Sequence, residues 1–66
     1  MDIVINGEQK RVTPGASLLD VLGQLQVDPR AVVVEHNRRI VRRPALGDVK
    51  VNEGDAIELV HFVGGG

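Results

Sequence analysis

The chain has 66 residues, a formal net charge of −1 and no cysteine. This length suits one small domain, and the missing cysteines exclude disulfide bridges and thiolate metal sites. Because Phe62 is the only aromatic residue, aliphatic side chains must build a thin core, which leaves little room for an enclosed cofactor or an enzyme pocket.

Residues 2–13 predict a β-hairpin. Apolar and polar residues alternate before Asn6-Gly7, a pair that tolerates the positive φ angles of a tight turn. Ile3 and Ile5 should therefore share the buried face, and Val12 is the core candidate of the return strand.

Residues 17–27 predict the one helix of the fold. Ser17 followed by Asp20 is typical of a capping box, in which the hydroxyl accepts a hydrogen bond from a free backbone N–H. Apolar residues recur at helical spacing: Leu18, Leu19, Val21, Leu22 and Leu25. Gly23 inside the helix costs about 1 kcal/mol relative to Ala, and we expect this glycine to let the helix approach the sheet closely.

Three further strands are expected. The β-branched run over residues 31–37 predicts a central strand, and a short strand should form around Ile40 and Val41. A turn at Asn52–Asp55 leads into a final strand from about Ala56. A hairpin, one helix and three strands in this order indicate an α+β fold, with the helix lying across one face of a small mixed sheet.

The final strand has two different faces. Ile57 and Leu59 suit the core, because Glu58 between them must reach water. Val60 and Phe62 then lie on the opposite face as adjoining exposed apolar groups, which favours a partner-docking surface. The alternative is that the strand twists or ends early, so that Phe62 folds back onto the edge of the core.

The sequence ends in three glycines, Gly64 to Gly66. They could be a frayed end or a cloning remnant. They could equally form a segment without side chains that carries a reactive main-chain carboxylate into a narrow site, since glycine has the backbone freedom to do so.

Several motifs, taken together, resemble the ThiS family of sulfur carriers, whose β-grasp fold is shared with ubiquitin. They are "ING" near the start, the helix "SLLDVLGQL", the strand pair "VVVEHNRRIVRR" and the closing "VNEGDAIELVHFVGGG". The Gly-Asp before the last strand and the terminal Gly-Gly are the most specific parts. The resemblance runs nearly end to end, and the extra glycine, Gly64, is the one departure from the family pattern.

The resemblance implies a mechanism centred on Gly66. An adenylating enzyme of the ThiF type would use ATP to activate the Gly66 carboxylate, and sulfur from a cysteine desulfurase or an equivalent donor would then replace AMP. Thiazole synthase of the ThiG type would take sulfur from the resulting thiocarboxylate. Gly64 and Gly65 would thread the tail into these enzymes, and Val60 and Phe62 would dock. The chain itself would be a co-substrate with no bound cofactor and no catalytic residue.

Other functions stay open. A molybdopterin-type sulfur carrier and a ubiquitin-like protein modifier also end in Gly-Gly. A different class is a β-grasp binding module that uses the basic edge Arg38–Arg43 on RNA or an acidic protein. The four arginines of this edge, Arg38, Arg39, Arg42 and Arg43, could face a partner or bind phosphate, or they could form a solvated edge that discourages aggregation.

The other polar side chains indicate no catalytic or metal site. Glu35, Asp55 and Glu58 have no nucleophile or base partner in the sequence pattern, and Asp55 is better interpreted as a turn residue. His36 and His61 are far apart in the sequence and have no acid at metal-ligand spacing, which argues against a metal site.

No apolar run approaches the roughly 20 residues that span a bilayer, and the N-terminus lacks the pattern of a secretory signal. We therefore expect a cytoplasmic protein that is a monomer when free. Residues 1–66 should form a single domain, with 64–66 as a flexible glycine tail.

Overall fold

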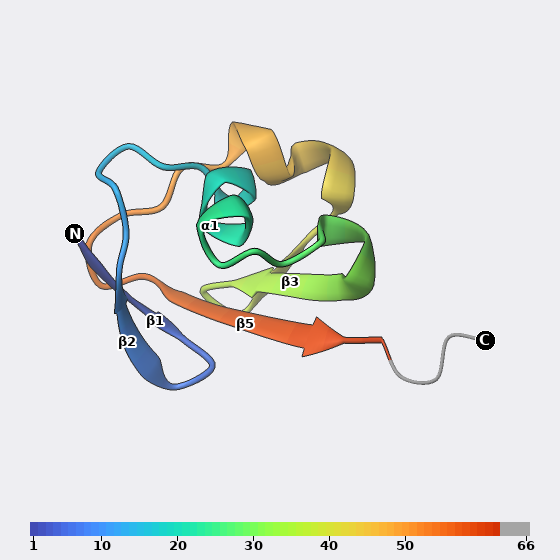
Figure 1. Ribbon diagram of the computed structural model, residues 1–66, viewed down its shortest axis with the longest axis horizontal. Coiled ribbons are helices and arrows are strands. Elements are labelled where there is room, and N and C mark those ends of the chain that lie inside the picture. Colours follow the sequence, from blue (N-terminus) through green and yellow to red (C-terminus); the bar gives the residue numbers. More distant parts are fainter. Residues whose placement is uncertain (63–66) are drawn as a thin grey trace.

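The computed structural model describes residues 1–62, which form a five-stranded mixed sheet with one α-helix on one of its faces (Figure 1). The elements are β1 (Asp2–Ile5), β2 (Glu8–Arg11), α1 (Leu18–Gln24), β3 (Val32–His36), β4 (Arg39–Val41) and β5 (Ala56–His61), with the 3₁₀ segments η1 (Pro29–Ala31) and η2 (Arg43–Asp48). The strand order is β2-β1-β5-β3-β4. In the middle, β5 runs parallel to β1 and antiparallel to β3. The predicted α+β class is confirmed, and this arrangement is that of a β-grasp fold.

The N-terminal hairpin forms as predicted. Asn6 and Gly7 take φ angles of 51° and 82°, the left-handed conformation that a tight hairpin turn requires. Ile3 and Ile5 are buried on the face toward α1. Val12 is also buried, although it follows β2 rather than lying within the strand.

The helix begins with the predicted capping box. The Asp20 backbone N–H donates to the Ser17 hydroxyl, and the Ser17 N–H donates to the Asp20 carboxylate, each at 3.0 Å. These bonds, first of all the one from the Ser17 backbone, hold the pKa of Asp20 below its usual value. The helix ends at Gln24, earlier than predicted. The chain turns there because Gln26 takes a left-handed φ of 59°.

The outer face of α1 differs from the prediction. Leu18, Val21 and Leu22 are buried, but Leu19 is 44% exposed. The expected close approach at Gly23 is wrong, because a Cβ built there would lie within 4 Å of no atom beyond the neighbouring residues and the backbone of the helix itself. Leu19 and Gly23 are four positions apart and therefore share the helix face that is turned away from the sheet.

The segment η2 was not predicted. It follows β4 and lies on the same side of the sheet as α1, against which it packs (Figure 1). Leu46 from η2 is only 1% exposed. The following residues are tied to the start of α1, since the Leu18 N–H donates to the Val49 carbonyl at 2.8 Å. Thus η2 covers the core beside the helix.

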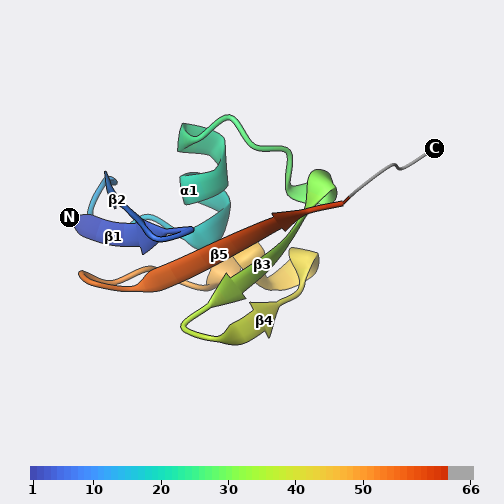
Figure 2. The same cartoon turned by 90° about the horizontal axis from the view of Figure 1, so that it is seen from below.

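The core lies between the sheet and the α1–η2 layer. Its buried residues are Ile3, Ile5, Val12, Ala16, Leu18, Val21, Leu22, Val32, Val34, Leu46, Val51, Ile57 and Leu59. Within residues 1–62 the helical segments lie on this one side, and Figure 2 views the molecule from the other. We call that second side the open face of the sheet.

Candidate functional site

The end of β5 carries the exposed apolar residues predicted to dock a partner. Ile57 and Leu59 are 1% and 8% exposed, whereas Val60 and Phe62 are 53% and 63% exposed. The predicted facing of these side chains is therefore confirmed, and their docking role stays a prediction. Phe62 does not fold back onto the core, and its N–H still donates to the Ala31 carbonyl at 3.0 Å.

An apolar patch forms where β5 and β3 meet on the open face. Val60 lies directly opposite Val33 in the register, so their side chains share one face. We call Val33, Val60 and Phe62 the open-face patch. Next to it, Glu35 and Glu58 lie directly opposite each other, where like charges repel and favour exposure to solvent. The patch therefore ends at a pair of carboxylates.

Two asparagines hold β5 in place, one on each side. The Ala56 N–H donates to Asn37 Oδ1 at 2.9 Å, and the Leu59 N–H donates to Asn6 Oδ1 at 2.8 Å. Asn6 and Asn37 both have left-handed φ angles, of 51° and 50°. The sequence indicates turns at both asparagines, but not which strand their amides reach, because that depends on the order of the strands.

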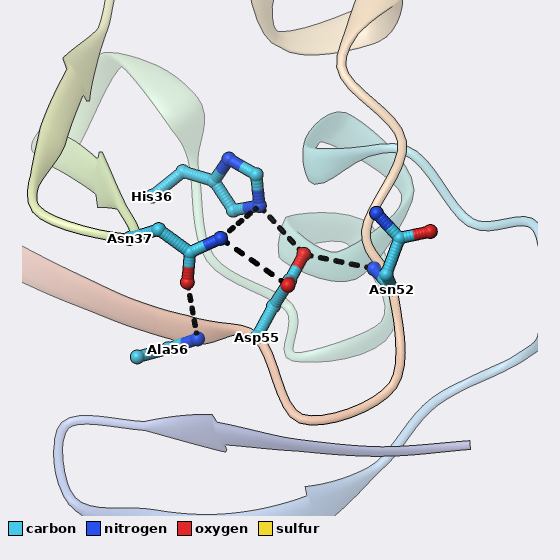
Figure 3. A network of polar contacts seen from close by, with 5 residues as sticks. All are labelled: His36, Asn37, Asn52, Asp55 and Ala56. Atoms are coloured by element: carbon cyan, nitrogen blue, oxygen red, sulfur yellow. Dashed lines mark hydrogen bonds and ion pairs between the residues drawn. The ribbon is translucent and has the colours of Figure 1, made fainter.

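A polar network joins the turn before β5 to the end of β3 (Figure 3). The His36 ring donates from Nε2 to Asp55 Oδ2 at 2.7 Å, and the Asn52 backbone N–H donates to the same oxygen at 2.8 Å. Asn37 donates from Nδ2 to Asp55 Oδ1 at 3.2 Å. The role of Asp55 as a turn residue is thus confirmed, whereas its contact with His36 was not predicted.

The electrostatics of Asp55 follow from this network. Burial raises the pKa of the carboxyl, but the hydrogen bonds from His36, the Asn52 backbone and Asn37 outweigh burial. The pKa of Asp55 is therefore lowered from 3.8. Asp55 lies just before Ala56, at the opposite end of β5 from the open-face patch. The network thus fixes where β5 starts.

The arginine cluster lies along the edge of the sheet. β4 is an edge strand in the order of the sheet, and Arg38, Arg39, Arg42 and Arg43 are all exposed. Arg38 and Arg39 lie at the turn that opens β4, whereas Arg42 and Arg43 follow its end. This placement agrees with the interpretation of a solvated edge, but it also divides the cluster into two pairs.

Three further predictions concern metal ligands, membrane-spanning helices and the terminal glycines. Within residues 1–62, no three His, Asp or Glu side chains are grouped so that they could hold a metal ion. Among the helices of the same residues, none combines the length and apolar character needed to cross a membrane. The predicted tail residues Gly64, Gly65 and Gly66 lie outside the described residues.

Comparison with known sequences finds relatives that align with most or all of the chain. It is 44% identical over 66 residues to the thiazole synthase of Paramagnetospirillum magneticum, and 42% identical to that of Magnetococcus marinus. It spans only 20% of the length of each of these proteins. It is also 38% identical over 50 residues to the sulfur carrier protein ThiS of Bacillus subtilis, covering 76% of both chains.

A solved structure has the same fold. The crystal structure of the thiamine biosynthesis protein ThiS from Geobacter metallireducens matches with a TM-score of 0.86 and 32% sequence identity, over the whole of both chains. Residues 3–66 match the model of the ThiS family. Since this match spans nearly the whole sequence and the fold agrees with it, the chain belongs to the ThiS family.

Proposed function

We propose that the chain is a sulfur carrier of thiamine biosynthesis, in which the main-chain carboxylate of Gly66 is the working group. The observation that carries this proposal is the ThiS family match, which extends from residue 3 to residue 66 and so includes the closing glycines. The likeness to the Bacillus subtilis sulfur carrier supports the same function. The chain acts as a co-substrate of other enzymes and turns nothing over itself.

The chemistry begins with activation of the carboxylate. A carboxylate is a poor acyl donor, so a ThiF-type enzyme transfers AMP from ATP to a Gly66 oxygen and releases pyrophosphate. The terminal sulfur of a persulfide on a cysteine desulfurase or an equivalent donor then attacks the carbonyl carbon and displaces AMP, which leaves the donor joined to Gly66 through an acyl disulfide. A thiol reductant cleaves the S–S bond, is itself oxidised to a disulfide, and releases the donor thiol and a thiocarboxylate on Gly66. ATP belongs to the partner enzyme, and the chain needs no cofactor of its own.

The geometry of β5 suits presentation of this group. Gly64 and Gly65 have no side chains to block a narrow site, but ordering each residue costs about 1–2 kcal/mol. Val60 and Phe62 lie four and two positions before Gly64 and are more than half exposed. Burial of one such apolar side chain against a partner contributes about 1.5–3 kcal/mol, which is enough to offset much of that cost.

A thiazole synthase of the ThiG type is the proposed acceptor of the sulfur. Two relatives named thiazole synthase contain a segment 44% and 42% identical to this chain. A carrier segment that shares a polypeptide with a synthase has its reaction partner close by, which favours a similar pairing here. This observation favours the thiamine branch over a molybdopterin-type carrier.

Intact-mass analysis tests the carboxylate chemistry directly. The chain is incubated with ATP, a ThiF-type enzyme, a cysteine desulfurase, cysteine and an excess of a thiol reductant such as dithiothreitol. The expected result is a mass gain equal to exchange of one oxygen for sulfur, located by fragmentation at Gly66. A variant with one alanine added after Gly66 is the matched control, which should fold normally and gain no sulfur. An unchanged mass with enzymes that are active on another carrier contradicts the proposal.

Complementation of deletion strains distinguishes a thiamine sulfur carrier from a molybdopterin-type carrier. We expect the chain to restore growth without thiamine to a strain that lacks its own thiamine sulfur carrier. It should not restore a strain that lacks the molybdopterin carrier. The reverse pattern, or stable covalent adducts of the chain on cellular proteins, would assign one of the alternative functions instead.

A further inference from the structure

A groove of about 530 Å³ runs beside Phe62. Its lining comes from η1, β3, the end of β4 and η2. In Figure 2, β3 lies between β5 and β4, so the groove extends from the end of β5 toward the sheet edge. Val33, Ile40, Pro44 and Phe62 give it an apolar lining. Two of these residues, Val33 and Phe62, also belong to the open-face patch.

The groove is also strongly basic. Its lining includes Arg30, Arg42 and Arg43 and no acidic residue, although the whole chain has a net charge of −1. Arg30 is already neutralised, because its Nη2 lies 3.0 Å from Asp28 Oδ2. Within residues 1–62, neither Arg42 nor Arg43 has an acidic oxygen within 4.0 Å. After the hydrogen bonds from Arg30, the charge of Arg43 also helps to lower the pKa of Asp28, so Arg43 lies near that carboxylate without forming an ion pair with it. Two guanidinium groups that make no ion pair within these residues therefore line a groove with apolar side chains.

The structure separates these two arginines from their neighbours in the sequence. Arg39 lies opposite His36 in the register of β4 against β3, at the end of β4 that is farther from the groove. Arg38 lies in the turn before β4 and has a φ of 71°. Neither Arg38 nor Arg39 lines the groove. A merely solvated edge does not require half of its charges to lie beside an apolar surface that adjoins the end of β5.

We propose that this groove binds an acidic and apolar polypeptide segment of the enzyme that acts on the end of the chain. An apolar side chain of that segment seats against Val33 and Phe62, and its carboxylates pair with Arg42 and Arg43. Guanidinium groups bind carboxylates with two parallel hydrogen bonds, and opposite charges speed association and fix the register of docking. The identity of the partner as that enzyme rests on the proposed function.

Charge complementarity favours a polypeptide over a nucleic acid here. Single-stranded nucleic acids need a basic groove with several aromatic side chains for stacking, and Phe62 is the only aromatic residue of the chain. The net charge of −1 also gives no overall attraction to a polyanion. A segment that combines carboxylates with apolar side chains matches both parts of the lining.

A peptide titration tests the groove without any enzyme. The ¹⁵N-labelled chain is titrated with the capped peptide Leu-Asp-Phe-Glu, and separately with Leu-Lys-Phe-Lys. We expect saturable shifts at the amides of Val33, Arg42 and Phe62 with the acidic peptide, and none with the basic one. The proposal that the groove binds an acidic segment would be overturned by the absence of shifts, by equal shifts with both peptides, or by shifts at other amides. Stronger binding of a short RNA at the same amides would also overturn it.

A kinetic comparison then tests the partner. The double variant Arg42→Ala/Arg43→Ala is compared with Arg38→Ala/Arg39→Ala, which removes the same charge from the same edge. The measured quantities are KM and kcat of a ThiF-type enzyme with each variant as the substrate of adenylation. Relative to the unaltered chain, we expect KM for the first variant to rise about tenfold and KM for the second to rise less than about twofold. We expect kcat to be retained with both. Added salt should reduce the difference in KM between the two double variants, because it screens the charges that distinguish them.

The outcomes of the two experiments are separable. Equal KM values for the two double variants would exclude the ThiF-type enzyme as the partner that binds the groove. Failure of the unaltered chain to be adenylated would contradict the proposed function, whereas the peptide titration would still decide the groove. Circular dichroism of both double variants checks that they fold, as expected for exposed side chains.

Discussion

Asn6 and Leu59 lie 53 positions apart, yet they exchange two hydrogen bonds. The Leu59 N–H donates to Asn6 Oδ1 at 2.8 Å, and Asn6 Nδ2 donates to the Leu59 carbonyl at 3.2 Å. The Asn6 backbone N–H also donates to the Ile57 carbonyl at 2.9 Å. The side-chain amide thus stands in for the next peptide group of β1, which ends at Ile5. It extends the bonding of β5 on the β1 side as far as Leu59, whereas on the other side β5 stays paired with β3 as far as His61.

Replacing Asn6 with glycine should weaken this end of β5. Glycine accepts the left-handed φ of 51° without strain, so the change isolates the lost amide. We expect the free energy of unfolding to fall by about 1–2 kcal/mol and hydrogen exchange at Leu59 to accelerate. Asn37→Gly is the matched control, which should affect Ala56 instead. Unchanged exchange at Leu59 in the Asn6 variant would show that the amide does not hold the strand.

Acid should remove the contribution of Asp55 to stability. The pKa of Asp55 in the folded chain is lowered from 3.8. Its ionised form therefore stabilises the fold above the ordinary pKa, and this contribution is lost as pH falls through the lower folded value. We expect Asp55→Asn to be less stable than the unaltered chain near neutral pH, with the difference shrinking below about pH 4. Urea unfolding of both proteins over a pH series measures this difference in the free energy of unfolding.

The control for this pH effect is Asp48→Asn. Asp48 is exposed and, within residues 1–62, forms no ion pair, so the difference in free energy of unfolding between Asp48→Asn and the unaltered chain should stay small over the pH series. A difference for Asp55→Asn that persisted into strong acid would mean that shape, rather than charge, explains the effect.

Gly23→Ala should stabilise the protein. Gly23 lies inside α1 with open space around the position of a Cβ, and alanine is favoured over glycine there by about 0.5–1 kcal/mol. For a domain of this size, the melting temperature should rise by about 4–8 °C per kcal/mol. Gly54→Ala is the control, because its surroundings are equally open but its φ is +83°. It should lower the melting temperature. A fall in both variants would contradict the role assigned to the helix position.

Leu46→Ala should destabilise the fold severely. Leu46 is 1% exposed, and truncation of a buried leucine to alanine costs about 2–5 kcal/mol through lost burial and a cavity. Leu19→Ala removes the same atoms from a side chain that is 44% exposed, and should cost about 1 kcal/mol or less. Urea unfolding of the two variants compares them. Similar losses would indicate that η2 is not a necessary cover of the core.

The parts of the fold that were predictable depend on short stretches of sequence. The Asn6-Gly7 turn and the Ser17–Asp20 capping box involve residues at most three positions apart, so local chemistry decides them. The alternation in the final strand also identified Val60 and Phe62 as exposed. Local patterns failed at Leu19, because an apolar residue at helical spacing faces the core only if a second element lies there.

The sequence by itself determined the turns, the start of the helix, which residues of β5 are buried and, through its family resemblance, the β-grasp architecture. Only the tertiary structure decided that Asn6 reaches Leu59 and that His36 meets Asp55. It also decided that Arg42 and Arg43 line one groove with Phe62, whereas Arg38 and Arg39 do not. These contacts depend on the order and register of strands that are distant in the chain. Hydrophobic burial sets that register over the whole sheet at once, so no single stretch of residues contains it.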